Sequence, residues 1–218
     1  MFEAFDEIRV ISLPDRTDRR RFMARQLRGT NFEFFDAMRI SQPGPFTNAG
    51  AFGGVLSHAL CLASAKGSIL ILEDDCLLPS EPYDVPDCDI FWAGWESRST
   101  TEVIGAQCVG YSARAAKQVA KYMFTLLDLT TPADPFAARQ PGFSPAIRPP
   151  YDGALMWFIR THPEIRTVFE PLTRQNSSRS DIAPGRLDRL PVVGHVVNLL
   201  RPLYAKSTTK SSSSRIEK

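Results

Sequence analysis

The stretch that most constrains this sequence is Ser68–Cys76, which reads SILILEDDC. Four consecutive aliphatic residues, at 69–72, form a run of the length expected for a strand buried on both faces, as in a parallel sheet. Three carboxylates, Glu73, Asp74 and Asp75, follow directly. Open α/β sheets bind ligands at the carboxyl ends of their strands, and repulsion among neighbouring carboxylates favours a cation there. The stretch therefore predicts a site for a divalent metal and a phosphate-bearing ligand.

The residues alone leave two interpretations of this triplet open. Carboxylate oxygens are hard ligands that suit magnesium or manganese and suit zinc or copper poorly. A metal held by one or two carboxylates completes its shell with water and substrate phosphates, and it can stabilise charge that builds up in a transition state. The competing interpretation is an acidic turn without a ligand, because short acidic motifs predict metal binding only loosely.

Length and composition predict one domain followed by a tail. With 218 residues, of which 43% are hydrophobic, the chain can bury a full core. We expect a single domain over residues 1–204 and a disordered Lys/Ser-rich tail over residues 205–218. The net charge of +2 argues against a dedicated nucleic-acid-binding protein, although six arginines between Arg16 and Arg28 concentrate positive charge near the start.

The cysteines and the apolar segments indicate a cytoplasmic protein. The four cysteines lack the paired spacing of a zinc site, and a reducing compartment is the simplest interpretation. No stretch approaches the roughly 20 apolar residues that span a bilayer, and no segment has the pattern of a signal peptide. Residues 192–204 are apolar and precede a basic tail, which predicts either peripheral contact with an anionic membrane or a final core helix.

Hydrophobic periodicity predicts strands and helices in alternation. Apolar runs and period-two patterns predict strands at residues 7–13, 31–36, 68–73, 89–94, 107–111 and 165–169. Helical patterns cover residues 18–27, with Thr17 or Asp18 as the N-cap, and residues 51–65, 116–127 and 151–159. Such alternation predicts an α/β fold with helices covering a mostly parallel sheet. Residues 130–150, rich in proline and alanine, are expected to form a long functional loop.

Three further residues carry two interpretations each. His58 flanks the apolar face of its predicted helix, where a histidine is either a hydrogen-bonded structural residue or a catalyst. Asp152 stands at the start of a predicted helix, so it is either an N-cap or first-turn carboxylate, or a general base at the end of the long loop. Asp181, between Ser180 and Ile182, has the same two interpretations.

Several separated segments together resemble glycosyltransferase family 25, which includes bacterial lipopolysaccharide galactosyl- and glucosyltransferases and the collagen galactosyltransferases. The segments keep the family's order over residues 8–182. They are VISLPDRTDRR at 10–20, GGVLSH at 53–58, ILEDD at 71–75, GYS at 110–112, YD at 151–152, and Gln175 with SDI at 180–182. Each motif is short, and their combination is what makes the resemblance specific.

The resemblance implies a GT-A-like (Rossmann-like) fold, with a mostly parallel sheet and helices on both faces. It also implies an inverting transferase that moves a hexose, galactose or glucose, from a nucleotide-sugar donor, usually linked to UDP. The acceptor would be a cell-surface glycan or lipopolysaccharide precursor, including a lipid-linked glycan at the inner face of the membrane. The implied cofactor is Mn²⁺ or Mg²⁺.

Transferred residue by residue, the resemblance makes Asp75 the direct metal ligand and Asp152 the catalytic base. The matched residues that would bind the donor are Ser12, Arg16, Arg19, Ser57, His58, Glu73 and Asp74. Among these, Asp74 would face the ribose, and Glu73 would support the metal shell through water. The chain departs from the family at Gly54, where the family pattern has cysteine, and it offers only His195 as a late third metal contact.

Two other classes of function are compatible with the sequence. One is a non-catalytic nucleotide- or glycan-binding protein that retains the fold, although the intact acidic triplet weighs against it. The other is a metal-dependent phosphotransferase or hydrolase, although the chain has neither a phosphate-binding loop motif nor a second dense carboxylate cluster.

Overall fold

The computed structural model describes residues 1–94, 96–99, 102–128 and 147–176. The chain divides into two compact units, Met1–Gln175 and Asn176–Lys218, and the description below concerns the first. The predicted extension of the domain to residue 204, the tail over residues 205–218 and the long loop at 130–150 lie almost entirely outside the described residues.

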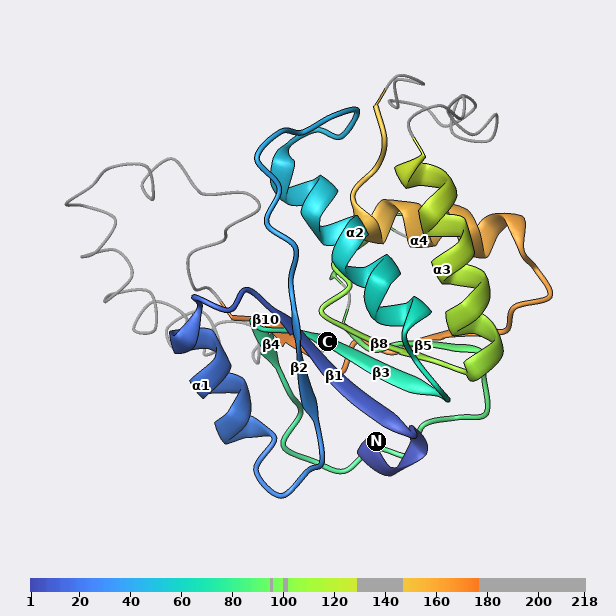
Figure 1. Cartoon of the computed structure of the whole chain (residues 1–218). Coiled ribbons are helices and arrows are strands. Elements are labelled where there is room, and N and C mark those ends of the chain that lie inside the picture. Colours follow the sequence, from blue (N-terminus) through green and yellow to red (C-terminus); the bar gives the residue numbers. More distant parts are fainter. Residues whose placement is uncertain (95, 100–101, 129–146, 177–218) are drawn as a thin grey trace, which may run out of the picture. The chain divides into compact units, whose positions relative to one another are not determined.

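The first unit is built around a sheet of six strands within the described residues, in the order β2-β1-β3-β8-β5-β9 (Figure 1). Five strands run parallel to one another, and β8 runs antiparallel to both of its neighbours. The predicted mostly parallel α/β sheet is therefore confirmed. The strands are β1 (Glu7–Ser12), β2 (Glu33–Asp36), β3 (Ile69–Glu73), β5 (Ile90–Trp92), β8 (Cys108–Tyr111) and β9 (Thr167–Phe169).

Helices cover both faces of this sheet. The side chains of each strand alternate between the two faces, so apolar side chains on both faces have to be buried. In β3, Ile69 and Ile71 join the core formed with α2, α3 and α4, whereas Leu70 and Leu72 join the core on the α1 side. Figure 1 shows α2, α3 and α4 on one side of the sheet and α1 on the other. The helices are α1 (Thr17–Gln26), α2 (Ala49–Ala63), α3 (Ala113–Leu127), α4 (Tyr151–Thr161) and a 3₁₀ helix, η1 (Phe2–Ala4).

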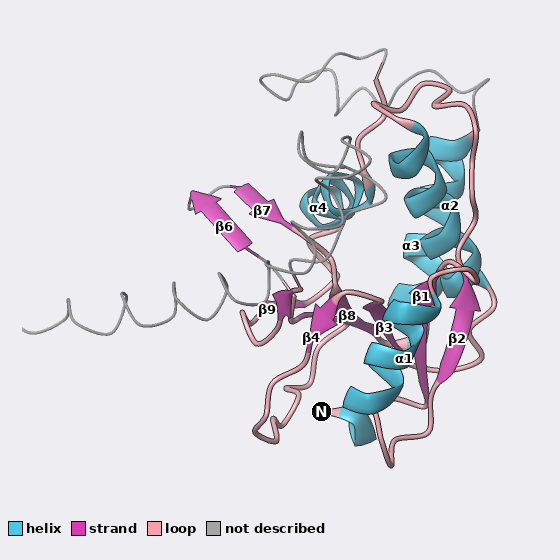
Figure 2. Cartoon of the chain, turned by 90° about the vertical axis from the view of Figure 1, so that its left-hand side faces the viewer, coloured by secondary structure: helices cyan, strands magenta, loops and turns pink. Residues whose placement is uncertain are grey.

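The antiparallel direction of β8 differs from a simple alternation of strands and helices. Between β5 and β8 the chain forms a hairpin, β6 (Glu96–Ser99) and β7 (Glu102–Ile104), in place of a crossover helix (Figure 2). A parallel return would require a crossover connection that carries the chain back to the other end of the sheet. Without one, β8 enters the sheet at the edge where β5 ends.

A second short ribbon lies next to the acidic triplet. Strand β4 (Cys76–Leu77) directly follows the triplet and pairs antiparallel with β10 (Arg174–Gln175), far along the chain. The polar composition of residues 175–182 predicts a loop, and this prediction is wrong for Gln175, which belongs to β10. Two-residue strands have no periodicity to detect, so only the tertiary structure shows this pairing.

Helix starts agree with the predicted positions to within about three residues, but the predicted N-cap of α1 is wrong. Thr17 and Asp18 are the first two helical residues, and Arg16 occupies the N-cap position without a side-chain capping bond. The Asp18 carboxylate accepts from the Arg16 guanidinium at 3.1 Å, and it lies inside the helix rather than at the N-cap position. In the part of the chain that the structure describes, no helix is both long and apolar enough to cross a membrane.

Candidate active site

The acidic triplet lies where β3 ends and the chain turns into β4. The backbone N–H of Glu73 still belongs to the sheet, because it donates to the carbonyl of Gln107 at 2.9 Å. Asp74 and Asp75 follow in the turn and are 8% and 6% exposed, whereas the Glu73 side chain is 29% exposed. Three residues that look alike in the sequence therefore occupy three different environments.

Each oxygen of Asp74 accepts a hydrogen bond from a neighbouring element. Ser12, at the end of β1, donates its hydroxyl to Asp74 Oδ2 at 2.7 Å, and Arg19 of α1 donates Nη1 to Asp74 Oδ1 at 2.6 Å. Arg19 is itself buried, at 8% exposure, so the ion pair is shielded from water. These contacts fix the orientation of the Asp74 carboxylate and join β1, α1 and β3 at one point.

Asp75 is engaged through one oxygen only. Its Oδ2 accepts from Gln175 Nε2 at 3.1 Å and lies 3.3 Å from Arg19 Nη1. Its Oδ1 is buried and has no hydrogen-bond partner among the described residues. Burial, followed by the charge of Glu73, raises the pKa of Asp75 to about 7. A buried carboxylate oxygen without a partner is unusual, and it is chemically suited to a cation or a proton.

Glu73 lies beside a buried histidine of α2, His58. His58 Nε2 of α2 lies 3.5 Å from Glu73 Oε1, and the His58 ring stacks on Tyr151 of α4 with a centroid distance of 3.7 Å and an interplanar angle of 14°. The Tyr151 hydroxyl lies 2.5 Å from the hydroxyl of Tyr111 on β8. Burial raises the pKa of both tyrosines above the ordinary value, so both are neutral phenols. These rings fix the plane of the imidazole beside Glu73.

Ser57, predicted to bind the donor, is engaged with the backbone. Its hydroxyl accepts from the N–H of Met38 at 2.8 Å and donates to the carbonyl of Gly53 at 2.6 Å. Ser57 therefore ties α2 to the segment that follows β2. This tie also fixes the rotation of α2, which directs the next residue, His58, toward Glu73.

The two arginines predicted to bind the donor have different positions. Arg19 lies among the buried carboxylates, whereas Arg16 donates Nε and Nη2 to the Asp18 carboxylate at 3.1 Å each, at the start of α1. Arg20, for which the sequence predicted no separate role, donates to the carbonyl of Ser12 at 2.9 Å and pairs with Asp36. The only signal for Arg20 was its place in the basic turn.

Asp152, predicted as the base, holds a loop in place. It lies in the first turn of α4 behind the N-cap Pro150, so it is a first-turn carboxylate rather than the N-cap. It accepts from the backbone N–H of Gly105 at 3.0 Å and from that of Gly153 at 2.8 Å. Trp92 Nε1 donates to the carbonyl of Gly105 at 2.9 Å, so the connection between β7 and β8 is held from both sides.

The carboxylates fit an open cation site better than a closed cage. Within the described ranges, no group of three or more His, Cys, Asp and Glu residues could hold a metal ion. Asp75 Oδ1 offers one hard ligand, and Mg²⁺ or Mn²⁺ commonly uses one or two carboxylates together with water and substrate phosphates. His195 and Asp181, the other candidates from the sequence, lie outside the described residues.

Comparisons with known proteins give remote structural similarity only. No family model matches the chain, and no curated protein matches it. A glycosyltransferase involved in glycosylation of the major capsid of PBCV-1 is 10% identical, with 80% of this chain and 93% of that chain covered and a TM-score of 0.47. The glycosyltransferase GlyE of Streptococcus pneumoniae TIGR4 is 10% identical, with 93% and 56% covered and a TM-score of 0.40.

A third solved structure is a nucleoside-diphosphate-sugar pyrophosphorylase from Vibrio cholerae RC9. It is 15% identical, with 78% of this chain and 75% of that chain covered and a TM-score of 0.35. At these scores, similarity assigns neither a family nor an activity to this chain.

Proposed function

We propose that the protein is an inverting glycosyltransferase that moves galactose or glucose from a UDP-linked donor onto a cell-surface glycan or lipopolysaccharide precursor. The observation that carries the proposal is the Asp75 carboxylate, whose buried Oδ1 has no partner within the described part of the chain. It lies at the carboxyl end of a central parallel strand, where α/β folds bind phosphate-bearing ligands. The choice of reaction rests on the resemblance of the sequence motifs.

The proposed cofactor is Mn²⁺ or Mg²⁺, held by Asp75 Oδ1. When bound, such a cation neutralises the charge on a departing nucleoside diphosphate. Glu73 is the one carboxylate of the triplet with substantial exposure, and its Oε1 lies 3.5 Å from His58 Nε2. From this position Glu73 is proposed to accept hydrogen bonds from water around the cation.

Asp74 is proposed to receive the ribose of the donor. Each Asp74 oxygen accepts one of the hydrogen bonds described above, from Ser12 or Arg19, and a carboxylate oxygen has a second lone pair. A ribose hydroxyl can therefore donate to Asp74 without displacing either partner. Arg19 holds Asp74 and Asp75 together and limits the repulsion between the two charges.

Asp152 is the proposed general base, with Asp181 as the alternative. Inversion in one displacement requires a base that takes the proton of the acceptor hydroxyl while its oxygen attacks in line with the leaving diphosphate. Asp152 directly follows Tyr151 at the start of α4. Tyr151 stacks on His58, which in turn lies beside Glu73, so the start of α4 is near the acidic triplet. Its two backbone hydrogen bonds hold the carboxylate in one orientation.

The proposal is tested by measuring hydrolysis and transfer of UDP-galactose and UDP-glucose with Mn²⁺, and donor affinity with and without the metal. We expect the substitution Asp75→Asn to abolish metal-dependent donor binding, because an amide oxygen is a weaker ligand for a hard cation. The proposal is falsified if the Asp75→Asn protein binds donor with wild-type metal dependence.

The contacts of Asp152 favour one competing function, a non-catalytic nucleotide- or glycan-binding protein. Both Asp152 oxygens already accept from backbone N–H groups, which a purely structural carboxylate would also do. Binding of UDP-sugars without hydrolysis or transfer would favour this competing function. If the wild type does turn the donor over, Asp152→Asn tests whether Asp152 is the base, and a transferase that uses it as the base loses turnover and keeps donor affinity. A protein that uses Asp152 only to hold the β7–β8 connection loses thermal stability, and its turnover falls only in proportion to the folded fraction.

The acceptor and the location complete the proposal. We place the protein in the cytoplasm, at the inner face of the membrane, with residues 192–204 in contact with anionic lipid. Sedimentation with anionic and neutral vesicles tests this contact. Binding to neither kind of vesicle, or equal binding by a chain that ends at residue 191, would refute it.

A further inference from the structure

Gln175 reaches the acidic triplet from 100 residues away in the sequence, and its Nε2 donates to Asp75 Oδ2 at 3.1 Å. The contact follows from the register of the short ribbon, in which Gln175 pairs with Cys76 and Arg174 pairs with Leu77. Because Cys76 directly follows Asp75, the backbone ladder itself carries the Gln175 side chain to the carboxylate.

The segment that leads to Gln175 is held by backbone contacts of its own. Leu172 N–H and Thr173 N–H donate to the carbonyl of Ala93 at 3.1 and 2.9 Å, and the Thr173 hydroxyl donates to the same carbonyl at 3.1 Å. Just before them, Glu170 N–H donates to the carbonyl of Trp92 at 3.0 Å. The path of the chain therefore does not depend on the Gln175 side chain, and removing that side chain should leave the ribbon in place.

The Gln175 amide has a specific effect on the Asp75 carboxylate. Two donors in the described part of the chain, Gln175 Nε2 at 3.1 Å and Arg19 Nη1 at 3.3 Å, lie against Asp75 Oδ2. Oδ1 is left buried and without a partner among the described residues. Two donors on one oxygen oppose rotation of the carboxylate, so the other oxygen keeps a constant direction. Gln175 does this without adding a charge, which leaves the negative charge of Asp75 available to a ligand.

We propose that Gln175 is a positioning residue, which holds Asp75 Oδ2 so that Oδ1 is presented to a divalent cation and the diphosphate it carries. This inference rests on the proposed function, because it names the residue that prepares the proposed metal ligand. Residues that orient a metal ligand from behind typically contribute 10- to 100-fold to metal affinity. We therefore expect Gln175→Ala to weaken Mn²⁺ affinity by about that factor.

Arg174 provides a matched control on the same strand. Neighbouring residues of a strand direct their side chains to opposite faces, so Arg174 and Gln175 differ in direction while sharing the ribbon. Arg174 is exposed. Arg174→Ala therefore tests the general effect of altering β10 and should leave Mn²⁺ affinity within about twofold of wild type, as expected of a surface substitution.

A third variant, Gln175→Glu, tests whether the amide donor is what matters. Glutamate keeps the length of the side chain but replaces the N–H donor with acceptors, so it repels Asp75 and cannot restore the contact. We expect Gln175→Glu to be no better than Gln175→Ala. Full retention of Mn²⁺ affinity by Gln175→Glu would show that the hydrogen bond to Asp75 is not needed.

The deciding measurement is a titration with Mn²⁺ alone. Binding is detected as paramagnetic broadening of the backbone amide signals of residues 73–77. We expect broadening in the wild type and in Arg174→Ala at concentrations where Gln175→Ala shows little. The inference is overturned if the wild type shows no broadening there, if Gln175→Ala broadens as the wild type does, or if Arg174→Ala loses the effect equally. Hydrolysis and transfer of UDP-sugars are measured separately, so a protein that shows the predicted Mn²⁺ pattern without turnover refutes the transferase and retains the role of Gln175.

Discussion

Two groups of carboxylates lie at opposite ends of the same parallel strands, and they differ in what their oxygens contact. Asp6 and Glu7 stand where β1 begins, beside the turn that enters β3. Asp74 and Asp75 stand where β3 ends. In the sequence each group is simply a cluster of acidic residues next to a strand. In the structure the two groups differ in which carboxylate oxygens are already engaged.

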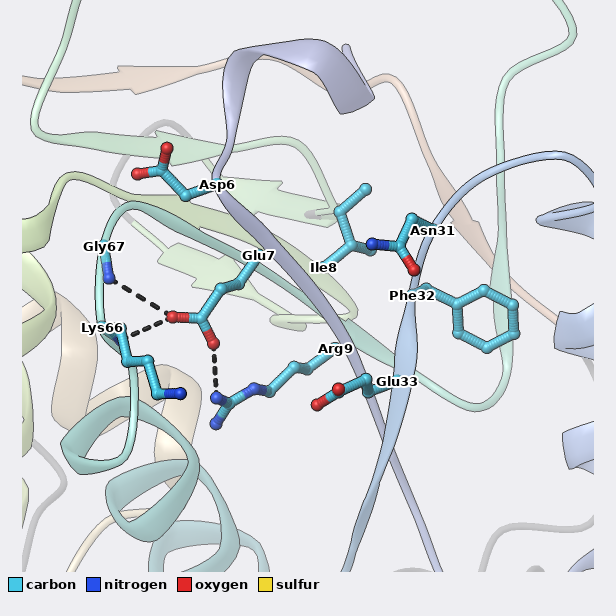
Figure 3. Close-up of a pocket in the computed structure, with 9 residues that line it drawn as sticks. All are labelled: Asp6, Glu7, Ile8, Arg9, Asn31, Phe32, Glu33, Lys66 and Gly67. Carbon is cyan, nitrogen blue, oxygen red and sulfur yellow. Dashed lines mark hydrogen bonds and ion pairs between the residues drawn. The ribbon is translucent and has the colours of Figure 1, made fainter.

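The carboxylates at the amino end of the sheet are engaged with the backbone of a turn. Glu7 accepts from the N–H groups of Lys66 and Gly67 and pairs with Arg9 (Figure 3). Although burial alone would raise the pKa of Glu7, these contacts together hold it below its ordinary value. The open pocket here, of about 480 Å³, is lined by Asp6, Glu7, Ile8, Arg9, Asn31, Phe32, Glu33, Lys66 and Gly67.

Acidic charge alone therefore does not identify a functional site. Asp6 likewise accepts from the N–H and the hydroxyl of Ser68, at 2.8 Å each. The hydrogen bond from the hydroxyl is the main cause that lowers the pKa of Asp6. At the amino end, then, carboxylates hold the turn before β3. At the carboxyl end, Asp75 has a buried oxygen that the described part of the fold does not use, and its pKa is raised to about 7.

Removing the arginine at each end should give the largest contrast in stability. Arg19 contacts both Asp74 and Asp75, so Arg19→Met leaves two buried carboxylates without their cation. Breaking a buried ion pair from one side typically costs about 3–5 kcal/mol, and we expect a loss of unfolding free energy in that range. Urea denaturation at neutral pH, with the slope compared to that of the wild type, measures it.

Arg9→Met is the counterpart at the amino end. Glu7 keeps its two backbone donors when Arg9 is changed, and the Glu7 side chain is 20% exposed, so water can replace part of the lost contact. We expect a clearly smaller loss than for Arg19→Met. Arg9 also donates to the carbonyl of Cys61 at 3.2 Å and to the hydroxyl of Ser64 at 2.6 Å. A loss equal to that of Arg19→Met would contradict this expectation without assigning the loss to charge compensation alone.

The comparison also shows how much of this arrangement the sequence could predict. The run at 69–72 and the helical pattern at 51–65 predicted β3 and α2 to within two residues, because burial imposes a period on each element. The pairing of β4 with β10 carries no such signal, since it joins two-residue strands far apart in the chain. The hairpin between β5 and β8, and with it the direction of β8, was missed for a similar reason.

The candidate site was predictable as a set of residues and not as a set of contacts. Ser12, Arg19 and Asp74 were all assigned to the donor, and the structure brings them together with one another. Whether they also bind a donor stays a prediction. No sequence pattern could show that Asp75 has one engaged and one open oxygen, because that distinction depends on Gln175, Arg19 and the burial of the turn.

A smaller effect is expected when the amino-end carboxylate is neutralised. Glu7→Gln keeps an oxygen for the turn but loses the charge that pairs with Arg9, and a partly exposed contact of this kind is worth about 1 kcal/mol or less. Because the folded-state pKa of Glu7 is lowered, its contribution is present above the ordinary pKa of glutamate and is lost as the pH falls through the lowered value. Thermal denaturation of both proteins at pH 7 and at pH 3 tests this.

For Glu7→Gln, the difference in melting temperature from the wild type should be larger at pH 7 than at pH 3, and Mn²⁺ and donor binding should be unchanged. A difference that grows toward acid would reverse the sign and contradict the lowered pKa. Loss of donor binding would place part of the functional site at the amino end of the sheet, so the two ends would no longer differ in function.

The smallest effect on the free energy of unfolding is expected at Gly54 in α2, where the described fold does not require a glycine. A Cβ added at Gly54 would meet nothing within 4 Å, and Gly54 lies in the interior of α2, four residues before His58. Glycine inside a helix is less favourable than alanine by roughly 0.5–1 kcal/mol, so Gly54→Ala should raise the unfolding free energy by about that amount. Chemical denaturation with an unchanged slope measures the gain.

Gly67 at the amino end gives the opposite case and serves as the control for Gly54→Ala. A Cβ added at Gly67 would meet the Asp6 carboxylate that holds the turn before β3, so Gly67→Ala should destabilise the protein. We expect the two substitutions to change the free energy of unfolding in opposite directions. A methyl group at Gly67 would meet the Asp6 carboxylate, whereas α2 has open space beside Gly54. A loss of stability in Gly54→Ala would mean that this space is filled in the folded protein, and the contrast between the two ends would then not extend to their glycines.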